Sequence, residues 1–200
     1  MILGNSRDTW RLEVVLKFLL LLILFHSVLP QGIMAAGFET PLGYNHNDYQ
    51  KVVAFLEQTD GVRKNGEKLN PDYDPEDPNT WIGLSWTGYP LRLRHFWESG
   101  KGLTGSLDLS GCTYLQGIDC ANNAITELNV SGCTSLDYLM IQNNKLTSLD
   151  VSECTNLAEL YCQDNSLVEL SVGSHPMLAY VRCENNHLTF ATLPALQGVN

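Results

Sequence analysis

Cysteines, histidines and one glycine-rich run are the features of this chain that could carry chemistry. The six cysteines lack the C-x-x-C spacing of a zinc or redox site, and the histidines His46, His95, His175 and His187 are scattered without an H-E-x-x-H motif. The run at residues 100–105 (GKGLTG) matches G-x-G-x-x-G, but S-L-D-L-S follows where nucleotide binding requires a helix. We therefore predict no metal site, no cofactor and no enzymatic activity.

A 21-residue unit that occurs four times in the sequence must position the remaining side chains. The copies read LQGIDCANNAI, LDYLMIQNNKL, LAELYCQDNSL and LAYVRCENNHL, and they start at Leu115, Leu136, Leu157 and Leu178. Their first, fourth and sixth positions are apolar or cysteine, which is typical of a short strand with one buried face. Stacking such units about 4.8 Å apart builds a parallel sheet over a continuous core.

The return half of each unit carries a second apolar pair, such as Leu149 and Val151, followed by turn-forming residues. A unit of 21 residues leaves no room for a full helix on this side. We therefore predict extended or short 3₁₀ segments there.

Two kinds of inward-facing column follow from the repeat. The ninth position is always asparagine, and a buried carboxamide can bond both the amides and the carbonyls that a sharp bend leaves unpaired. We predict a structural asparagine ladder of Asn123, Asn144, Asn165 and Asn186. The cysteines fill two columns, Cys112, Cys133 and Cys154, and Cys120, Cys162 and Cys183. We expect buried free thiols, because aligned Cβ vectors on stacked strands suit a disulfide poorly.

The start of the chain has the layout of a signal peptide. Three basic residues precede the apolar run at residues 18–25, and small residues at 35–37 offer a cleavage site. The run is shorter than the ~20 residues of a membrane span, and an uncleaved anchor is the alternative. Removal of residues 1–36 takes away three basic and two acidic groups and leaves a net charge of about −11. That charge disfavours binding to nucleic acid or to an anionic membrane.

Residues 37–98 are predicted to form an N-terminal cap of helix, acidic linker and hairpin. Residues 45–61 favour a helix capped by Asn45 or Asn47, with an apolar face. Residues 62–80, rich in Pro, Asp and Asn, are interpreted as a solvated linker. The run N-P-D-Y-D-P-E-D-P-N from Asn70 is similar to a calcium loop, but it lacks the glycine and the terminal glutamate of an EF-hand.

The hairpin is predicted from residues 81–86, the turn T-G-Y-P and residues 91–97. Like the helix, it would close the open end of the stacked core.

The repeat frame L-x-x-L-x-L-x-x-N-x-L is that of leucine-rich repeats. A helix with A-F-L, a W-x-G strand, an Arg-rich strand and L-T-G-S-L-D-L-S resemble the N-terminal cap and first repeat of receptor-like leucine-rich-repeat ectodomains, although the cap lacks their cysteine pair. The later pattern L-D-V-S-x-C-T-x-L-x-x-L-x-C-x-x-N-x-L is similar to exported bacterial proteins akin to internalins. Together the resemblances cover roughly residues 46–193.

These resemblances imply an α/β, mostly β, solenoid in which residues 99–200 form a right-handed leucine-rich-repeat coil with a parallel concave sheet. They also imply a binding role. Val199 falls on the first leucine position of a fifth unit, so we expect the repeats to continue beyond Asn200.

The concave surface is the predicted binding site, because repeat proteins usually bind through the residues that lie between the buried leucines. Three tyrosines on adjacent strands should form one contiguous patch with flanking polar residues. The predicted ligand-binding residues are Tyr138, Tyr161, Tyr180, Met140, Asp119, Glu159 and Arg182. The second and seventh positions add a polar rim that suits sugars equally. The alternative is that the tyrosines simply favour exposed strands.

Two functions remain open at this point. The first is a secreted or cell-surface binding module that recognises a protein or glycan through its concave face. The second is a structural spacer or stalk that presents a further domain. Neither requires a cofactor, a nucleic-acid partner or membrane insertion after signal cleavage.

Overall fold

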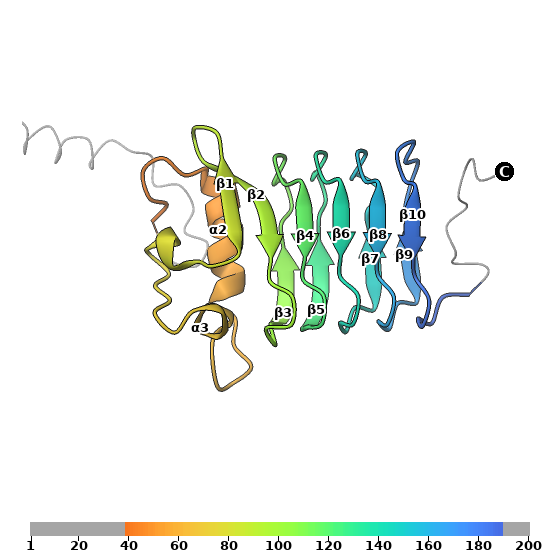
Figure 1. Ribbon diagram of the computed structural model, residues 1–200, viewed down its shortest axis with the longest axis horizontal. Coiled ribbons are helices and arrows are strands. Elements are labelled where there is room, and N and C mark those ends of the chain that lie inside the picture. Colours follow the sequence, from red (N-terminus) through yellow and green to blue (C-terminus); the bar gives the residue numbers. More distant parts are fainter. Residues whose placement is uncertain (1–38, 190–200) are drawn as a thin grey trace, which may run out of the picture. The chain divides into compact units, whose positions relative to one another are not determined.

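Residues 39–189 are described by a computed structural model, in which they form a mostly-β solenoid of stacked parallel strands (Figure 1). The predicted signal peptide and the expected continuation of the repeats lie outside these residues. No helix of the described part is long and apolar enough to cross a membrane. The predicted fold class is confirmed as a β-rich solenoid with parallel sheets.

Helix α2, His46–Leu56, lies within the predicted range of residues 45–61 but ends at Leu56, before the predicted stop at Gly61. The side chain of Asn45 caps it by accepting a hydrogen bond from the Asp48 amide at 3.2 Å. The helix buries the predicted apolar face, because Tyr49 and Val52 are fully buried, as are Val53 and Leu56. Phe55 extends this face and packs edge-on against Phe96 with 5.8 Å between ring centroids.

The segment at residues 62–80, interpreted as a solvated linker, contains helix α3, Asn65–Leu69, and the 3₁₀ turn Pro78–Thr80. The acidic residues Asp72, Asp74 and Glu76 are exposed to solvent, and side chains of this kind in the segment also close local turns. Asp74, for example, accepts a hydrogen bond from the Glu76 amide at 2.9 Å. The Trp81 indole also donates to the Asp74 carbonyl at 2.9 Å, so the segment folds back onto the Trp81 ring.

The predicted hairpin is also present. Strand β1, Leu84–Thr87, pairs antiparallel with β2, Arg92–Trp97, and β2 then begins a parallel run. The run continues through β4, Gly117–Asp119, β6, Tyr138–Met140, β8, Glu159–Tyr161, and β10, Tyr180–Arg182. From β4 onward each strand is offset from the next by one 21-residue unit, so that Leu139 pairs with Leu160. Strand β2 is offset from β4 by 22 residues, as in the pair His95 and Gly117.

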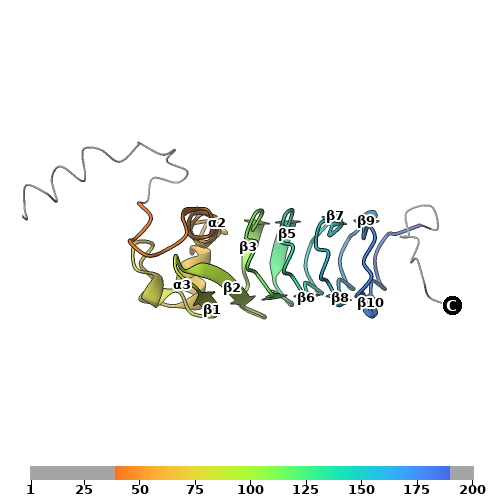
Figure 2. The same cartoon turned by 90° about the horizontal axis from the view of Figure 1, so that it is seen from above.

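The return halves of the units form a second layer of short strands (Figure 2). They are β3, Thr104–Asp108, paired with β5, Ala124–Asn129, and β7, Ser148–Asp150, paired with β9, Glu169–Ser171. The prediction of extended return segments is confirmed.

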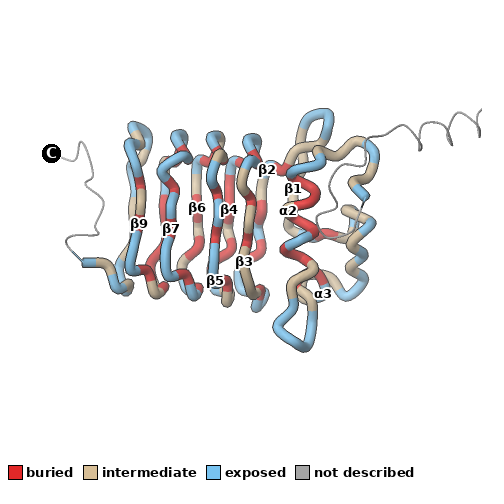
Figure 3. The backbone as a smooth tube through the Cα atoms, turned by 180° about the vertical axis from the view of Figure 1, so that it is seen from behind, coloured by how far each residue is buried: buried red, intermediate tan, exposed pale blue. Residues whose placement is uncertain are grey.

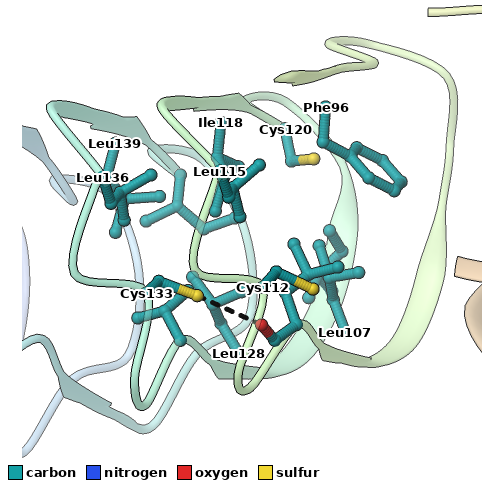
Figure 4. Packing of buried hydrophobic residues seen from close by; sticks show 14 of the residues in the cluster. Phe96, Leu107, Cys112, Leu115, Ile118, Cys120, Leu128, Cys133, Leu136 and Leu139 are labelled. Carbon is teal, nitrogen blue, oxygen red and sulfur yellow. Dashed lines mark hydrogen bonds between the residues drawn. The ribbon is translucent and has the colours of Figure 1, made fainter. Parts of the chain in front are cut away.

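The apolar core runs between the two strand layers, where buried positions recur from turn to turn as far as Val172 (Figure 3). In the last described copy, Leu178, Val181 and Leu188 are partly buried. In Figure 4 the leucine and cysteine side chains of successive turns point toward this shared interior. The thiol of Cys133 donates to the carbonyl of Leu109 at 3.1 Å, and Cys154 donates to Val130 at 3.5 Å. His175 occupies the same position in the next turn, with Nε2 2.9 Å from the Val151 carbonyl.

All six cysteines are free, and Cys183 alone among them is partly exposed. Burial raises the pKa of Cys133, Cys154 and Cys162 to about 12 in each case. These residues are therefore neutral thiols that fill the core, as the sequence predicted.

The four ladder asparagines bond the backbone of their own turn and of the preceding one. Asn144 donates to the carbonyls of Cys120 at 2.9 Å and Ile141 at 3.1 Å, and it accepts from the Ile125 amide at 3.0 Å. The residue before each ladder asparagine has a positive φ of 55° to 58°, a feature that the sequence analysis missed; these are Asn122, Asn143, Asp164 and Asn185. Asn and Asp tolerate this left-handed conformation better than other residues except glycine.

Side chains from the N-terminal part of the chain also form hydrogen bonds with the backbone groups at the outer edge of β3. Gln58 accepts from the Ser106 amide at 2.8 Å and donates to its carbonyl at 2.7 Å. Buried Asn65 does the same for Thr104, at 3.0 Å and 2.9 Å. An edge strand that would otherwise expose unpaired backbone groups is thus covered by two carboxamides.

Candidate binding surface

We name the outward surface of the six-stranded sheet the six-stranded face. Beyond the hairpin strand β1, its side chains come from β2, β4, β6, β8 and β10. Strand register aligns them in two rows. The first row is His95, Gly117, Tyr138, Glu159 and Tyr180, and the second is Trp97, Asp119, Met140, Tyr161 and Arg182. All seven predicted binding residues lie in these rows.

Strand β2 adds His95 and Trp97, which the sequence analysis missed because they precede the first full copy of the repeat. The alternation of β2 carried a signal, since Phe96 between them is fully buried and pairs with Ile118. The period of the repeat did not identify them, because His95 pairs with Gly117, which lies 22 residues later, so a step of 21 residues back from Gly117 reaches buried Phe96. The centroids of the His95 and Trp97 rings lie 4.5 Å apart, and the ring planes are inclined at 30°. His95 Nδ1 is 2.8 Å from the Ser85 hydroxyl.

A hollow of ≈ 500 Å³ lies on the N-terminal part of the six-stranded face. It brings together four of the predicted residues, and the full lining is Trp97, Asp119, Asp137, Tyr138, Met140 and Glu159. Trp97 is 50% exposed, which leaves half of a large aromatic side chain open to solvent. The hollow thus has aromatic and thioether walls beside three carboxylates.

The position of Tyr138 depends on the absence of a side chain at Gly117. A Cβ at Gly117 would lie 2.3 Å from Cζ of Tyr138, so the ring occupies the space above the glycine. Burial raises the pKa of Tyr138, and the carboxylates of Asp119 and Asp137 act in the same direction against a hydrogen bond from Trp97. The phenol is therefore neutral and lies beside Trp97 in the wall of the hollow.

Tyr161 and Tyr180 form a separate ring pair, with centroids 5.1 Å apart and planes at 36°. The Tyr161 hydroxyl donates to Glu159 at 3.2 Å, and Arg182 pairs with Glu184. The expected single patch of three tyrosines is thus divided into two groups. The physical reason is the free space over Gly117, which lets Tyr138 turn toward Trp97.

The hollow is acidic and lacks a basic side chain in its lining. None of the five ion pairs among residues 39–189 involves Asp119, Asp137 or Glu159. His95, behind Trp97, does not supply the missing positive charge at neutral pH, because burial and the nearby Arg94 lower its pKa. Unpaired negative charge therefore gathers beside exposed aromatic surface.

The geometry gives less support to a metal site, an anion site or a cysteine nucleophile. Within residues 39–189, no group of three or more His, Cys, Asp or Glu side chains is arranged to hold a metal ion. The glycine run at residues 100–105 leads into strand β3 instead of a helix, which removes the anion site that the motif requires. The buried thiols with raised pKa values are poor nucleophiles.

Comparison of the sequence with protein-family models and with curated proteins found no match in either case.

Proposed function

We propose that this chain is an exported leucine-rich-repeat binding module that recognises a partner at a cell surface through its six-stranded face. The observation that carries the proposal is the hollow, where Trp97, Tyr138 and Met140 stand beside unpaired carboxylates. Exposed Trp, Tyr and Met side chains are enriched at protein interfaces relative to the rest of a protein surface. In this proposal the face corresponds to the concave surface of the repeat coil, and the N-terminal helix and hairpin are its cap.

Two sequence features support the exported location. The first 36 residues have the layout of a signal peptide, and the repeats are similar to those of exported bacterial proteins. Neutral buried thiols are compatible with an oxidising compartment, because protonated and inaccessible thiols react slowly.

A structural spacer explains less of the molecule. The core columns and the asparagine ladder would serve a spacer equally well, because they hold the turns together. A spacer gives no reason for Trp97 at 50% exposure or for Tyr180 at 46%, both on the same face. The return-half surface exposes polar and acidic residues such as Glu127, Ser148 and Glu169, and also Val168, but no aromatic ring among these.

The test is capture of cell-surface proteins and glycans by two variants of the mature chain. The first, Tyr138→Ala with Tyr161→Ala, removes one ring from each aromatic group of the six-stranded face. The control, Glu127→Gln with Ser148→Ala and Glu169→Gln, alters the opposite surface.

We expect the first variant to lose capture roughly 30-fold or more, as for loss of a central aromatic anchor, while the control captures normally. Both variants should stay folded and melt within several degrees of the wild type, because partly exposed side chains on strands contribute about 1 kcal/mol or less each to folding. Capture that survives in the first variant and fails in the control would place the binding surface on the return halves and refute the proposal.

A further inference from the structure

We propose that the hollow on the six-stranded face receives a basic side chain, lysine or arginine, from a protein partner. The inference rests on the binding function proposed above and specifies the chemistry of its ligand. The hollow presents the carboxylates of Asp119, Asp137 and Glu159, and none of them pairs with a basic residue of the described chain.

The aromatic wall suits the same ligand. A lysine ammonium or an arginine guanidinium over the face of Trp or Tyr is attracted by the ring quadrupole, most strongly by Trp. Trp97 is held in place by its contact with the His95 ring, yet half of its surface remains open. Tyr138 is fixed over Gly117 with a neutral hydroxyl, so its ring faces the hollow without adding negative charge.

A basic side chain fits both surfaces at once. Its aliphatic stem would pack on Met140 and the rings, and its charged end would reach the carboxylates. The volume of ≈ 500 Å³ falls within the ~300 to 1,000 Å³ of sites that enclose small ligand groups.

A neutral sugar fits less well. It could stack on Trp97, but the three carboxylates would then be partly removed from water without a compensating charge, which is costly. The remainder of the face, with the Tyr161–Tyr180 pair and Arg182, would contact the rest of a protein partner beyond the basic side chain.

The proposal is tested with defined probes. The full chain is titrated against fluorescein-labelled nonapeptides of alternating glycine with lysine, arginine or glutamate, and binding is measured by fluorescence anisotropy. A neutral oligosaccharide of β-linked glucose is measured by calorimetry as the sugar probe.

Two matched variants distinguish binding at a specific site from general attraction of basic peptides to the net charge of −10. The hollow variant is Asp119→Asn with Asp137→Asn and Glu159→Gln. The control variant is Glu127→Gln with Asp150→Asn and Glu169→Gln on the opposite surface, where all three residues are exposed. Each variant removes three negative charges and keeps the shape of the side chains.

We expect the lysine and arginine peptides to bind and the glutamate peptide to be excluded. The hollow variant should bind at least about 10-fold more weakly, whereas the control should change affinity less than about 2-fold. Trp97→Ala should also weaken binding several-fold through loss of the cation–π contact, and binding should weaken between about 0.05 M and about 0.5 M salt.

Three outcomes would overturn the inference: equal loss in the hollow and control variants, binding of the oligosaccharide in place of the basic peptides, or no peptide binding at millimolar concentration. A concave-face binder that keeps its natural partner after neutralisation of the carboxylates, but loses it in the Tyr138→Ala, Tyr161→Ala variant, would refute the basic ligand and leave the proposed function standing.

Discussion

Glu98 offers a direct test of how the first turn joins the hairpin. Its side chain is 2% exposed, and its Oε1 has no hydrogen-bond partner among the described residues. The carboxyl group lies against Gly83, where an added Cβ would be 1.7 Å from Oε1. Both backbone groups of Glu98 are hydrogen-bonded. The amide donates to the Asp119 carbonyl at 2.7 Å, and the carbonyl accepts from the Asn123 side chain at 2.7 Å.

Burial raises the pKa of Glu98 from 4.5 to about 7, against the opposing effect of Lys101. The folded chain therefore binds more protons than the unfolded chain between these two values. The contribution of Glu98 to stability is fully present below pH 4.5, falls as pH rises, and is lost above pH 7. At about 1.4 kcal/mol per pKa unit, the difference amounts to about 3 kcal/mol.

The perturbation is Glu98→Gln, which removes the ionisation and keeps the shape. The free energy of unfolding should be measured by urea denaturation, followed by circular dichroism, at intervals between pH 5 and pH 8. We expect the free energy of unfolding of the wild type minus that of the variant to fall by about 2.5 kcal/mol between pH 5 and pH 8, because part of the change occurs below pH 5.

The difference between the two proteins is the informative quantity, because other carboxyl groups titrate equally in both. Asp108 and Glu184, whose pKa values are lowered, contribute in the opposite direction. Wild-type and variant curves that run parallel from pH 5 to pH 8 would refute the assignment of a buried, protonated Glu98.

Two further predictions concern the repeat itself. Asn144→Ala should lower the free energy of unfolding by about 3 kcal/mol, because the Cys120 carbonyl and the Ile125 amide lose their partner, whereas Asn143→Gly, at a φ of 55°, should change it by less than about 1 kcal/mol in urea denaturation. Under native conditions Cys183 should react with iodoacetamide before Cys120, which is fully buried with a raised pKa, and equal rates by mass spectrometry would contradict the buried-thiol column.

The sequence predicted those features that repeat and missed those that depend on a single contact. Four aligned copies were enough to assign strands, return segments and inward columns, because the residue type at each position could be compared among four copies. The folded segment at residues 62–80 was missed because its turns rely on local side-chain to backbone bonds, such as Asp74 to Glu76, that composition does not distinguish from solvation.

The predicted binding residues show the same division. Register alone was enough to place Tyr138 on the outer side of the sheet, since a strand position determines which side of the sheet a side chain occupies. It did not determine the direction of the ring on that face, which follows from the missing side chain at Gly117 one strand away. Trp97 escaped notice because β2 pairs with the solenoid while belonging to the hairpin.

The division between repeated and singular positions also explains where a binding site can arise in such a fold. The first, fourth, sixth and ninth positions hold the turns together, so a change there costs stability in proportion to the number of neighbours that it contacts. The third and fifth positions lie on the outer side of the sheet and vary from Gly117 to Tyr138 to Glu159 without altering strand register. The hollow lies where this variation includes a glycine beside a bulky ring. In the proposed binding module, recognition can therefore change by substitution in two rows while the core that supports them stays constant.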